Sequence, residues 1–490
     1  MNSNLPTECL LQIFENFGPT NNNWDDSFKL LHACILVNRK WCEAGITILW
    51  REPIEWLHSK EHNRNRLVPL ISSYISCLPQ DSKFQILNSG LQLPVSPFSL
   101  VAIDYPSLLK GFDYQSLYNA IDFWVNANYK PDYEIYQDDV IFHQFQLMEL
   151  ICRLLMNRCK NLKRFSIFMK AGNKGMKVDI LQLPLLPGAK ECFSNITEFS
   201  CKGCLFPEFM YLAAQTCRNI KRFNIECCCK DNEGLAKLIE LQKVPLDCIL
   251  INFKGNQIPL LESAIRKKSH SITNVRLFGY EMVLDYFREC KNIERMRLKI
   301  SSPMLSDVAK NFMNSSFPKL KELFISMNTL SQSSVLIKNT HGSLESLTIN
   351  SIYLNETELP AFTETLINSC KNLYHYDGPF HIERIETLQS FFQNCPKLEC
   401  LILRKINGDN LDISDALQRS GPFVPINLTM LQVTNYTISS EALEIFLRAC
   451  VTRLYRVLEF IYKPTSQQVK LTMEKFADQK DIKAIFENKF

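Results

Sequence analysis

Histidine, glutamate and cysteine residues are the side chains whose types and spacing could do chemistry here. His58, Glu61 and His62 match the H-x-x-E-H spacing of a zinc site, in which two histidines one helical turn apart hold the ion and the glutamate acts as base. The cationic polar run 63–66 follows them, and no third ligand is identifiable. A solvated helix face is therefore the favoured interpretation, and we predict no metal site.

A cysteine-rich stretch raises the same question. Cys201 and Cys204 have C-x-x-C spacing, and Cys227, Cys228 and Cys229 follow. A shift of 24 residues aligns Cys201 with the apolar Ile225 and Cys204 with Cys228, which predicts that the latter two lie on adjacent repeats. Adventitious zinc binding or an oxidation-prone pair stays open beside the favoured interpretation, in which these cysteines are small buried hydrophobic residues.

Other catalytic patterns do not occur in the sequence. It contains no G-x-G-x-x-G, no phosphate-binding G-x-x-x-x-G-K-S/T and no G-x-S-x-G elbow. The eight histidines form no triad that the sequence reveals. We therefore expect a protein that is not an enzyme, with no catalytic residues and no cofactor.

Composition bounds the partners and the compartment. The 490 residues are 46% hydrophobic and 22% charged, and the net charge of +4 gives no footprint for nucleic acid. The sequence shows neither a signal peptide nor a membrane-spanning segment, so we expect no membrane partner and a cytoplasmic or nuclear location. In those compartments the 19 cysteines would be reduced thiols.

One apolar pattern recurs twelve times along the chain. The repeated strands that it predicts would form the frame for any site. It has apolar residues at a first position, at +3 and at +5, and runs from Leu162/Phe165/Ile167 to Leu454/Val457/Glu459, where it weakens. The mean interval, about 26 residues, is that of leucine-rich repeats. Strand alternation turns the +4 residues away from the core. We predict a target-binding concave surface made by Ser166, Asn224, Arg276, Arg297, Phe324, Thr348, Ile402 and Gln432.

A helical signal precedes many of these strands. Leu388, Phe391, Phe392 and Cys395 show the i, i+3, i+4, i+7 spacing of an apolar helix face that ends in cysteine, and four other segments share it. The order helix, cysteine, turn, strand resembles the cysteine-containing class of leucine-rich repeats. The predicted fold class is α/β: a solenoid with a parallel concave sheet and convex helices.

The first fifty residues predict a separate helical element. Pro6 and Glu8 suit a helix start, and Leu10, Ile13, Phe14 and Phe17 form one apolar face. Two more helical segments follow, the second carrying Trp41 and Trp50. Three helices in so short a segment make a small core, so we expect a partner or the next domain to cover surplus apolar surface.

This segment resembles an F-box, the three-helix unit that docks a protein onto a ubiquitin-ligase scaffold. The resemblance implies binding to a Skp-family adaptor, and through it to a cullin, by Leu5, Pro6, Leu10, Ile13, Leu36, Val37, Trp41 and Trp50. We therefore divide the chain into an F-box (1–52), a helical linker or degenerate first repeats (53–145), irregular leucine-rich repeats (146–462) and a charged C-terminal capping helix (463–490).

The expected function is that of a substrate receptor in a Skp/cullin/F-box ubiquitin ligase, whose repeats bind an unknown target protein. The main alternative is a repeat scaffold or inhibitor that does not engage the ligase. A third, more distant alternative is a small-ligand receptor that uses the concave face.

Overall fold

The structure of the protein is a computed structural model that describes residues 5–17, 24–54, 66–93, 103–129, 137–168, 180–228, 230–254, 257–301, 306–326, 329–350, 355–382, 385–405, 411–454, 456–464, 466–477 and 482–486. The chain forms two compact units. Unit 1 comprises Met1–Glu226 and Asp231–Val244, and unit 2 comprises Cys227–Lys230 and Pro245–Phe490. The histidine pair His58/His62 and Cys229 lie outside the described residues, as does the side chain of Cys228.

Unit 1 begins with helices and continues with four parallel strands. Its strands are β1 (Gly111–Asp113), β2 (Arg164–Ile167), β3 (Glu198–Lys202) and most of β4 (Arg222–Cys228), in the order of the chain. Its helices are α1 (Thr7–Glu15), α2 (Trp24–Ile35), α3 (Arg39–Leu49), α5 (Leu67–Ser76), α6 (Gln80–Asn88), α7 (Tyr114–Asn128), α8 (Gln137–Arg158), α10 (Ala189–Ser194), α11 (Pro207–Thr216) and α12 (Glu233–Glu240), with 3-10 turns at Tyr105–Leu108 and Leu183–Leu185.

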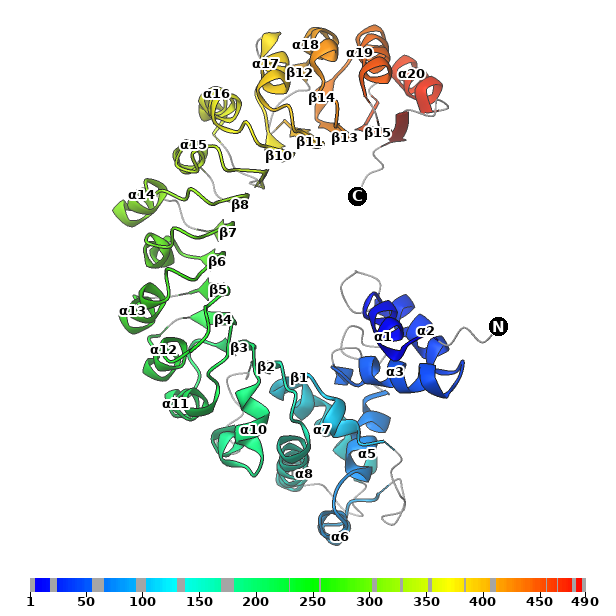
Figure 1. Cartoon of the computed structure of the whole chain (residues 1–490), viewed down its shortest axis with the longest axis vertical. Coiled ribbons are helices and arrows are strands. Elements are labelled where there is room, and N and C mark those ends of the chain that lie inside the picture. The colour runs from blue at the N-terminus through cyan, green and yellow to red at the C-terminus, as the bar shows by residue number, and fades with distance from the viewer. Residues whose placement is uncertain are drawn as a thin grey trace. The chain divides into compact units, whose positions relative to one another are not determined.

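Unit 2 alternates strands and helices, with the helices on the outer side of a curved row of strands (Figure 1). Its parallel strands are β5 (Cys248–Phe253), β6 (Asn274–Gly279), β7 (Arg295–Ile300), β8 (Glu322–Ser326), β9 (Ser346–Ile349), β10 (His375–Pro379), β11 (Cys400–Arg404), β13 (Met430–Thr434), β15 (Leu458–Tyr462) and β16 (Ile482–Phe486). Its helices are α13 (Pro259–Lys267), α14 (Asp307–Met313), α15 (Leu330–Lys338), α16 (Leu359–Ser369), α17 (Glu386–Asn394), α18 (Ser414–Ser420), α19 (Ser440–Arg453) and α20 (Gln467–Ala477), with 3-10 turns at Glu281–Phe287, Glu356–Glu358 and Gly421–Phe423. A small second sheet pairs β12 (Leu411–Asp412) with β14 (Tyr436–Thr437).

The predicted anchors stack in register and form the core of both units. In unit 1 the +3 positions Phe165, Phe199 and Phe223 pair across β2, β3 and β4, and each is buried. In unit 2 the equivalent row starts at Ile249 and Val275 and is likewise buried. Burial of one such side chain contributes about 1.5–3 kcal/mol. A row of them repeated on every strand therefore defines the strand register, and the α/β repeat fold is confirmed.

A corner after many helices links one repeat to the next. Asn219, Asn292 and Asn372 each lie two residues after a cysteine, and their amide groups donate to a backbone carbonyl of the preceding repeat at 2.8, 2.6 and 2.9 Å. The thiol of Cys395 also donates to the carbonyl of Cys370, at 3.3 Å. The asparagine bonds join the turn of one repeat to the backbone of the preceding repeat, which gives a physical reason for the Cys-x-Asn pattern.

The prediction for the final strand was wrong in register. The sequence pattern assigned Val457 and Glu459 as inward anchors, but β15 buries Phe460 and Tyr462 while Val457 is exposed. The reason is that α19 continues three residues past Cys450, to Arg453, so the strand begins later. The segment 463–490 contains more than the predicted charged capping helix. Helix α20 has a buried face, and β16 follows it as a further strand of the sheet.

The segment 53–145 contains the helices that the sequence predicted and one strand that it missed. The helical character expected of this segment is confirmed by α5, α6 and α7. The missed strand, β1, pairs with β2 through Phe112 and Phe165. Leu109, Phe112 and Tyr114 carry the repeat pattern and are buried. A difference outside this segment concerns Val283, Tyr286, Phe287 and Cys290, one of the four other sets with helical spacing, where the chain forms a 3-10 turn at Glu281–Phe287 in place of an α-helix.

Candidate docking surfaces

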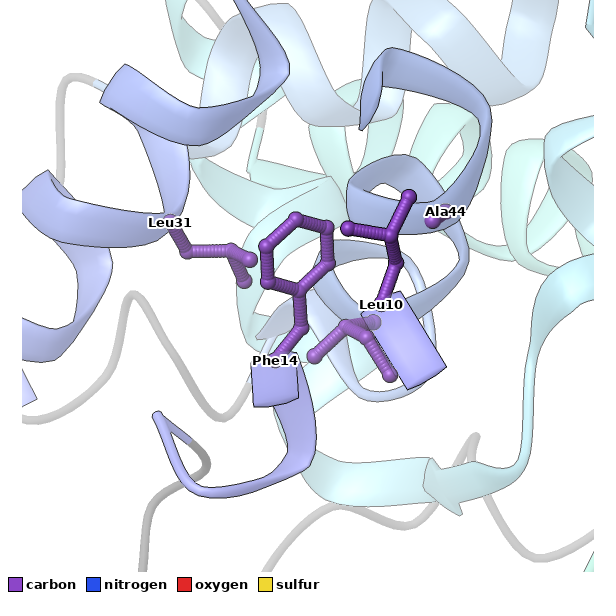
Figure 2. Packing of buried hydrophobic residues seen from close by; sticks show 5 residues of the cluster. Leu10, Phe14, Leu31 and Ala44 are labelled. Atoms are coloured by element: carbon purple, nitrogen blue, oxygen red, sulfur yellow. The ribbon is translucent and has the colours of Figure 1, made fainter. Parts of the chain in front are cut away.

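The first surface belongs to α1, α2 and α3, which share a small apolar core. Leu10 and Phe14 of α1 pack with Leu31 of α2 and with Ala44 and Ile48 of α3, and all five are buried. Figure 2 shows the Phe14 ring lying between Leu31 and the pair formed by Leu10 and Ala44. The i, i+4 spacing of Leu10 and Phe14 turns one face of α1 inward, which leaves the other side of the helix exposed.

The turn between α2 and α3 presents apolar residues to solvent. Asn38 caps α3, because its side chain accepts a hydrogen bond from the backbone N–H of Trp41 at 3.0 Å. Immediately before this cap, Leu36 and Val37 are 73% and 59% exposed. The cap fixes the turn that holds them outward. Leu5, Ile13 and Leu30 are the other large exposed apolar residues among the described part of these helices.

A joint of aromatic and charged residues connects α3 to the repeats of unit 1. The Trp50 ring stacks on Tyr105 with 4.0 Å between ring centroids and meets Tyr74 edge-on at 5.7 Å. The Arg51 carbonyl accepts from the N–H groups of Lys110 and Gly111 at 2.8 and 3.1 Å. Lys110 in turn accepts from two N–H groups of the next repeat in the same way. The chain at Arg51 thus takes the place of a preceding repeat.

An ion pair strengthens this joint. Glu52 is buried and pairs with Arg164 of β2, whose Nε donates to Glu52 Oε1 at 2.8 Å. Burial, the largest cause, lowers the pKa of the Arg164 guanidinium from its usual value, and the carboxylate of Glu198 opposes that shift. Arg51 also pairs with Glu15 of α1 at 2.9 Å. The three helices are therefore held to the first strands by polar contacts as well as by ring stacking.

The eight residues that the resemblance assigned to the adaptor have three kinds of environment. Leu5, Pro6, Ile13, Leu36 and Val37 are exposed. Leu10 is buried in the three-helix core, and Trp50 packs on Tyr105, so these two side chains support the surface from within; adaptor binding by the eight residues stays a prediction. Trp41 is half-buried, with its ring edge-on to Phe14 at 5.5 Å. Leu30, which sequence reasoning missed, joins the exposed set.

The second surface is the face of the strands that the helices leave uncovered, here termed the open face. The predicted +4 residues share one row in each unit. In unit 1 Ser166 aligns with Ser200 and Asn224. In unit 2 the row runs through Leu250, Arg276, Arg297, Phe324, Thr348, Asp377, Ile402, Gln432, Ile461 and Ile485. Target binding by this row stays a prediction.

Charged residues of the open face interact mostly with neighbouring strands. Arg404 of β11 pairs with Asp377 of β10 at 2.8 Å, while the second carboxylate oxygen of Asp377 is buried with no hydrogen-bond partner. Burial raises the pKa of Asp377 from its usual value, and the charges of Arg404 and His375 oppose that rise. The Arg297 guanidinium lies over the Phe324 ring, 4.3 Å from its centroid.

The cysteines whose side chains the structure describes are thiols, and no disulfide joins any two of them. Cys201 is buried opposite Ile225, which confirms its predicted core position, whereas Cys204 is exposed. Burial raises the pKa of the Cys217, Cys290 and Cys395 thiols to about 12. These three stay protonated at neutral pH and act as small apolar residues.

The described residues contain neither a cluster of metal ligands nor a membrane-spanning helix. In the part of the chain that the structure describes, no three or more histidine, cysteine, aspartate or glutamate side chains gather as a metal site would require. Over the same residues, no helix combines the length and the apolar character needed to cross a membrane.

The repeat geometry decides the fold class. Each repeat supplies one short parallel strand, and a helix or a 3-10 turn precedes the next strand at most steps, with buried anchors in register. The chain has a leucine-rich-repeat fold. No protein-family model matches it, and no curated protein matches it. The leucine-rich repeats supply the frame for both surfaces.

Three solved structures are similar in backbone at 10–11% identity. A TLR13–ssRNA13 complex has a TM-score of 0.37 over 78% of this chain and 62% of that chain. The leucine-rich-repeat ectodomain of the Arabidopsis thaliana receptor kinase GASSHO1/SCHENGEN3, in complex with CASPARIAN STRIP INTEGRITY FACTOR 2, gives 0.29 over 69% and 52%. LegL7, a leucine-rich-repeat-containing protein of Legionella pneumophila, gives 0.31 over 68% and 96%. This chain thus spans less than two thirds of the length of the first two chains.

Proposed function

We propose that this protein is the substrate-recognition subunit of a Skp/cullin/F-box ubiquitin ligase. In this proposal α1–α3 bind a Skp-family adaptor, and the open face of the repeats holds a target protein. The observation that carries the proposal is the exposure of Leu36 and Val37 at the turn between two helices whose own core is already complete. Leu5, Ile13 and Leu30 extend this apolar exposure.

The exposure favours a docking role over a purely structural one. A helical cap on a repeat array would turn its apolar residues toward the array, as Trp50 does. Leu36 and Val37 instead meet water, and burial of each would release about 1.5–3 kcal/mol. Clustered exposed apolar residues mark interaction sites in soluble proteins. The Leu5-Pro6 start and the order of Leu36, Val37 and Trp41 point to a Skp-family adaptor as that partner.

The catalytic contribution in this proposal is proximity. A receptor raises the effective concentration of substrate lysines near the conjugating enzyme and supplies no reacting group itself. That role is served best when the docking helices and the target-binding face cannot swing freely. The joint at Trp50, Arg51 and Glu52 supports this requirement within unit 1, because it combines stacking, two backbone hydrogen bonds and an ion pair.

The alternative is a repeat scaffold or inhibitor that does not engage the ligase. It accounts for the leucine-rich-repeat fold equally well, since such arrays present extended binding faces. It gives no reason for the solvent exposure of Leu36 and Val37. The two proposals differ in one observable, which is whether the full chain binds a Skp-family adaptor.

The deciding experiment is co-expression of the full chain with a Skp-family adaptor, followed by size-exclusion chromatography. We expect a stable complex that the double variant Leu36→Asp/Val37→Asp weakens by more than about a hundredfold, since two buried apolar contacts are lost. Val457→Asp/Leu471→Asp is the matched control, because both residues are exposed apolar residues far along the chain, 48% and 54% exposed. It should leave the complex intact.

Two measurements test whether a loss of binding is due to misfolding of a variant. The variants change exposed residues only, so circular dichroism and the urea midpoint should match those of the unaltered chain. Leu10→Ala, by contrast, should lose binding together with helical signal, because Leu10 lies in the core. A monodisperse, folded chain that ignores the adaptor at micromolar concentration would overturn the ligase proposal and favour the scaffold.

A further inference from the structure

Two adjacent strands of unit 2, β6 and β7, present a basic patch on the open face. The outward side chains of β7 are Arg295, Arg297 and Lys299, and all three are exposed. Arg276 of β6 is exposed as well and lies directly opposite Arg297 in the strand register. Neighbouring strands are about 4.8 Å apart, and alternate residues along a strand about 6.6 Å. The four cations of this basic patch therefore occupy one compact area.

Elsewhere on the sheet, cations are paired with carboxylates across strands. Arg222 meets Glu198, its register partner, at 2.9 Å. Lys483 meets Glu459, again its register partner, at 2.6 Å. Asp377 and Arg404 pair in the same manner between β10 and β11, as described above. Neutralisation by the adjacent repeat is thus the usual arrangement on this face.

The basic patch departs from that arrangement. Among the described residues, none of Arg276, Arg295, Arg297 and Lys299 has a carboxylate within ion-pair distance. Like charges in opposing positions on neighbouring strands destabilise a sheet. The contact of Arg297 with the Phe324 ring offsets part of this repulsion but brings no negative charge. The placement of the two opposed arginines therefore calls for a counter-charge from outside the chain.

We propose that the basic patch binds an anionic segment of a target protein, through carboxylate or phosphate groups. Arginine donates in a planar fork that matches both groups. Apolar surface lies beside the charges, because Phe278 of β6 is the register partner of Lys299 and Phe324 of β8 is that of Arg297. Arginine and aromatic side chains are the types enriched at protein interfaces. This assignment deepens the proposed function and rests on the open face being where a target is held.

The dimensions of the basic patch favour a protein segment over a nucleic acid. A nucleic acid carries a charge at every nucleotide, and its affinity grows with the length of the basic track. Here the track spans two strands, and Glu322, the register partner of Arg295, borders it on β8. Asp377 lies further along the same row. A short anionic segment flanked by neutral or apolar residues fits this pattern, whereas a continuing phosphate backbone would meet carboxylates.

Fluorescence anisotropy with the full chain tests the proposal. The probes are labelled oligoglutamate, a phosphoserine–glycine peptide, a neutral serine–glycine peptide and oligouridylate RNA. We expect both anionic peptides to bind and the neutral one not to, with affinity that falls as salt rises. The double variant Arg276→Ser/Arg297→Ser should weaken anionic binding about tenfold, since two exposed charge contacts are lost. Tighter binding of one anionic peptide identifies carboxylate or phosphate as the preferred source.

The control variant Lys190→Ser/Lys371→Ser removes the same charge from two exposed lysines outside the basic patch. It should change anionic binding by less than about twofold. An equal effect of the two double variants would overturn the proposal, because net charge would then be the cause. Stronger binding of the RNA than of either peptide, or no binding of any anion, would also overturn it.

The test separates this proposal from the proposed function. Arg276→Ser/Arg297→Ser should still co-purify with the Skp-family adaptor, and Leu36→Asp/Val37→Asp should still bind the anionic peptide. A chain that binds the peptide but not the adaptor would leave the basic patch assigned and the ligase proposal refuted. A chain that binds the adaptor but no anion would give the reverse result.

Discussion

The opposed arginines of β6 and β7 give a prediction in which a charge reversal strengthens the fold. Arg276→Glu would replace a repulsion with Arg297 by the arrangement that Glu198 and Arg222 already have. With the two charges about 6 Å apart and an effective dielectric constant of about 40–80, the interaction is worth about 0.7–1.4 kcal/mol before screening. A Debye length of about 8 Å at physiological ionic strength reduces this by about half.

The change in free energy of unfolding follows from those figures. Arg276→Ser removes the repulsion and should raise the free energy of unfolding by about 0.3–0.7 kcal/mol. Arg276→Glu reverses its sign and should give about twice that gain. Arg222→Ser, the matched control, removes one partner of an existing exposed pair and should lower the free energy of unfolding by about 0.2–1 kcal/mol.

Urea unfolding followed by circular dichroism measures these changes. In about 1 M salt the Debye length falls to about 3 Å, and the differences among the three variants and the unaltered chain should largely vanish. The reasoning is refuted if Arg276→Glu lowers the free energy of unfolding, as Arg222→Ser does. It is equally refuted if the gain is the same in high salt, because it would then come from packing and not from charge.

Two further predictions concern titration and thiol reactivity. Burial raises the pKa of Asp377, so the unaltered chain should gain stability relative to Asp377→Asn as pH falls from about 7 to below the usual aspartate value of about 3.8. Urea midpoints of the two chains, measured side by side, would show this gain. A midpoint of the unaltered chain that falls relative to that of the variant on acidification would contradict it. In native protein at about pH 8, site-resolved alkylation should modify the exposed Cys204 quickly and Cys217, Cys290 and Cys395 only after unfolding; equal rates would contradict their burial.

Much of the repeat fold could be predicted because its signal is periodic and buried. Positions +3 and +5 are buried and therefore apolar, so the register that pairs Phe165, Phe199 and Phe223 can be predicted from the sequence. The pattern fails where helix length changes. Helix α19 continues past Cys450 to Arg453, so β15 begins only at Leu458. A fixed spacing from the cysteine cannot reveal this later start.

The missed strand β1 has a different cause. Leu109, Phe112 and Tyr114 satisfy the repeat pattern, but two helices, α7 and α8, separate them from Leu162. A search for one helix per repeat therefore passes over the strand. A search for the apolar spacing alone, with the interval left free, would have found it.

The docking surface was less predictable than the repeats. In a small bundle every apolar position on a helix has similar local chemistry, so the sequence does not separate the buried Leu10 from the exposed Ile13 three residues later. Only the packing of α1 against α2 and α3 decides which of the two faces water. The cross-strand pairs of the open face are equally hidden, because Glu198 and Arg222 become neighbours only once the repeat register is known.

The N-terminal helices can serve both as a cap for the repeats and as a docking unit, because different residues are available for each role. Arg51 and Glu52 bond to the first strands, as a preceding repeat would, whereas Leu36 and Val37 lie at the turn between α2 and α3 and are exposed. Variants of the two sets should therefore act separately. Glu52→Gln should lower the stability of unit 1 with adaptor binding retained. Leu36→Asp/Val37→Asp should weaken adaptor binding and leave the stability of unit 1 unchanged. If either variant lost both stability and adaptor binding, the cap and the docking surface would be one structure.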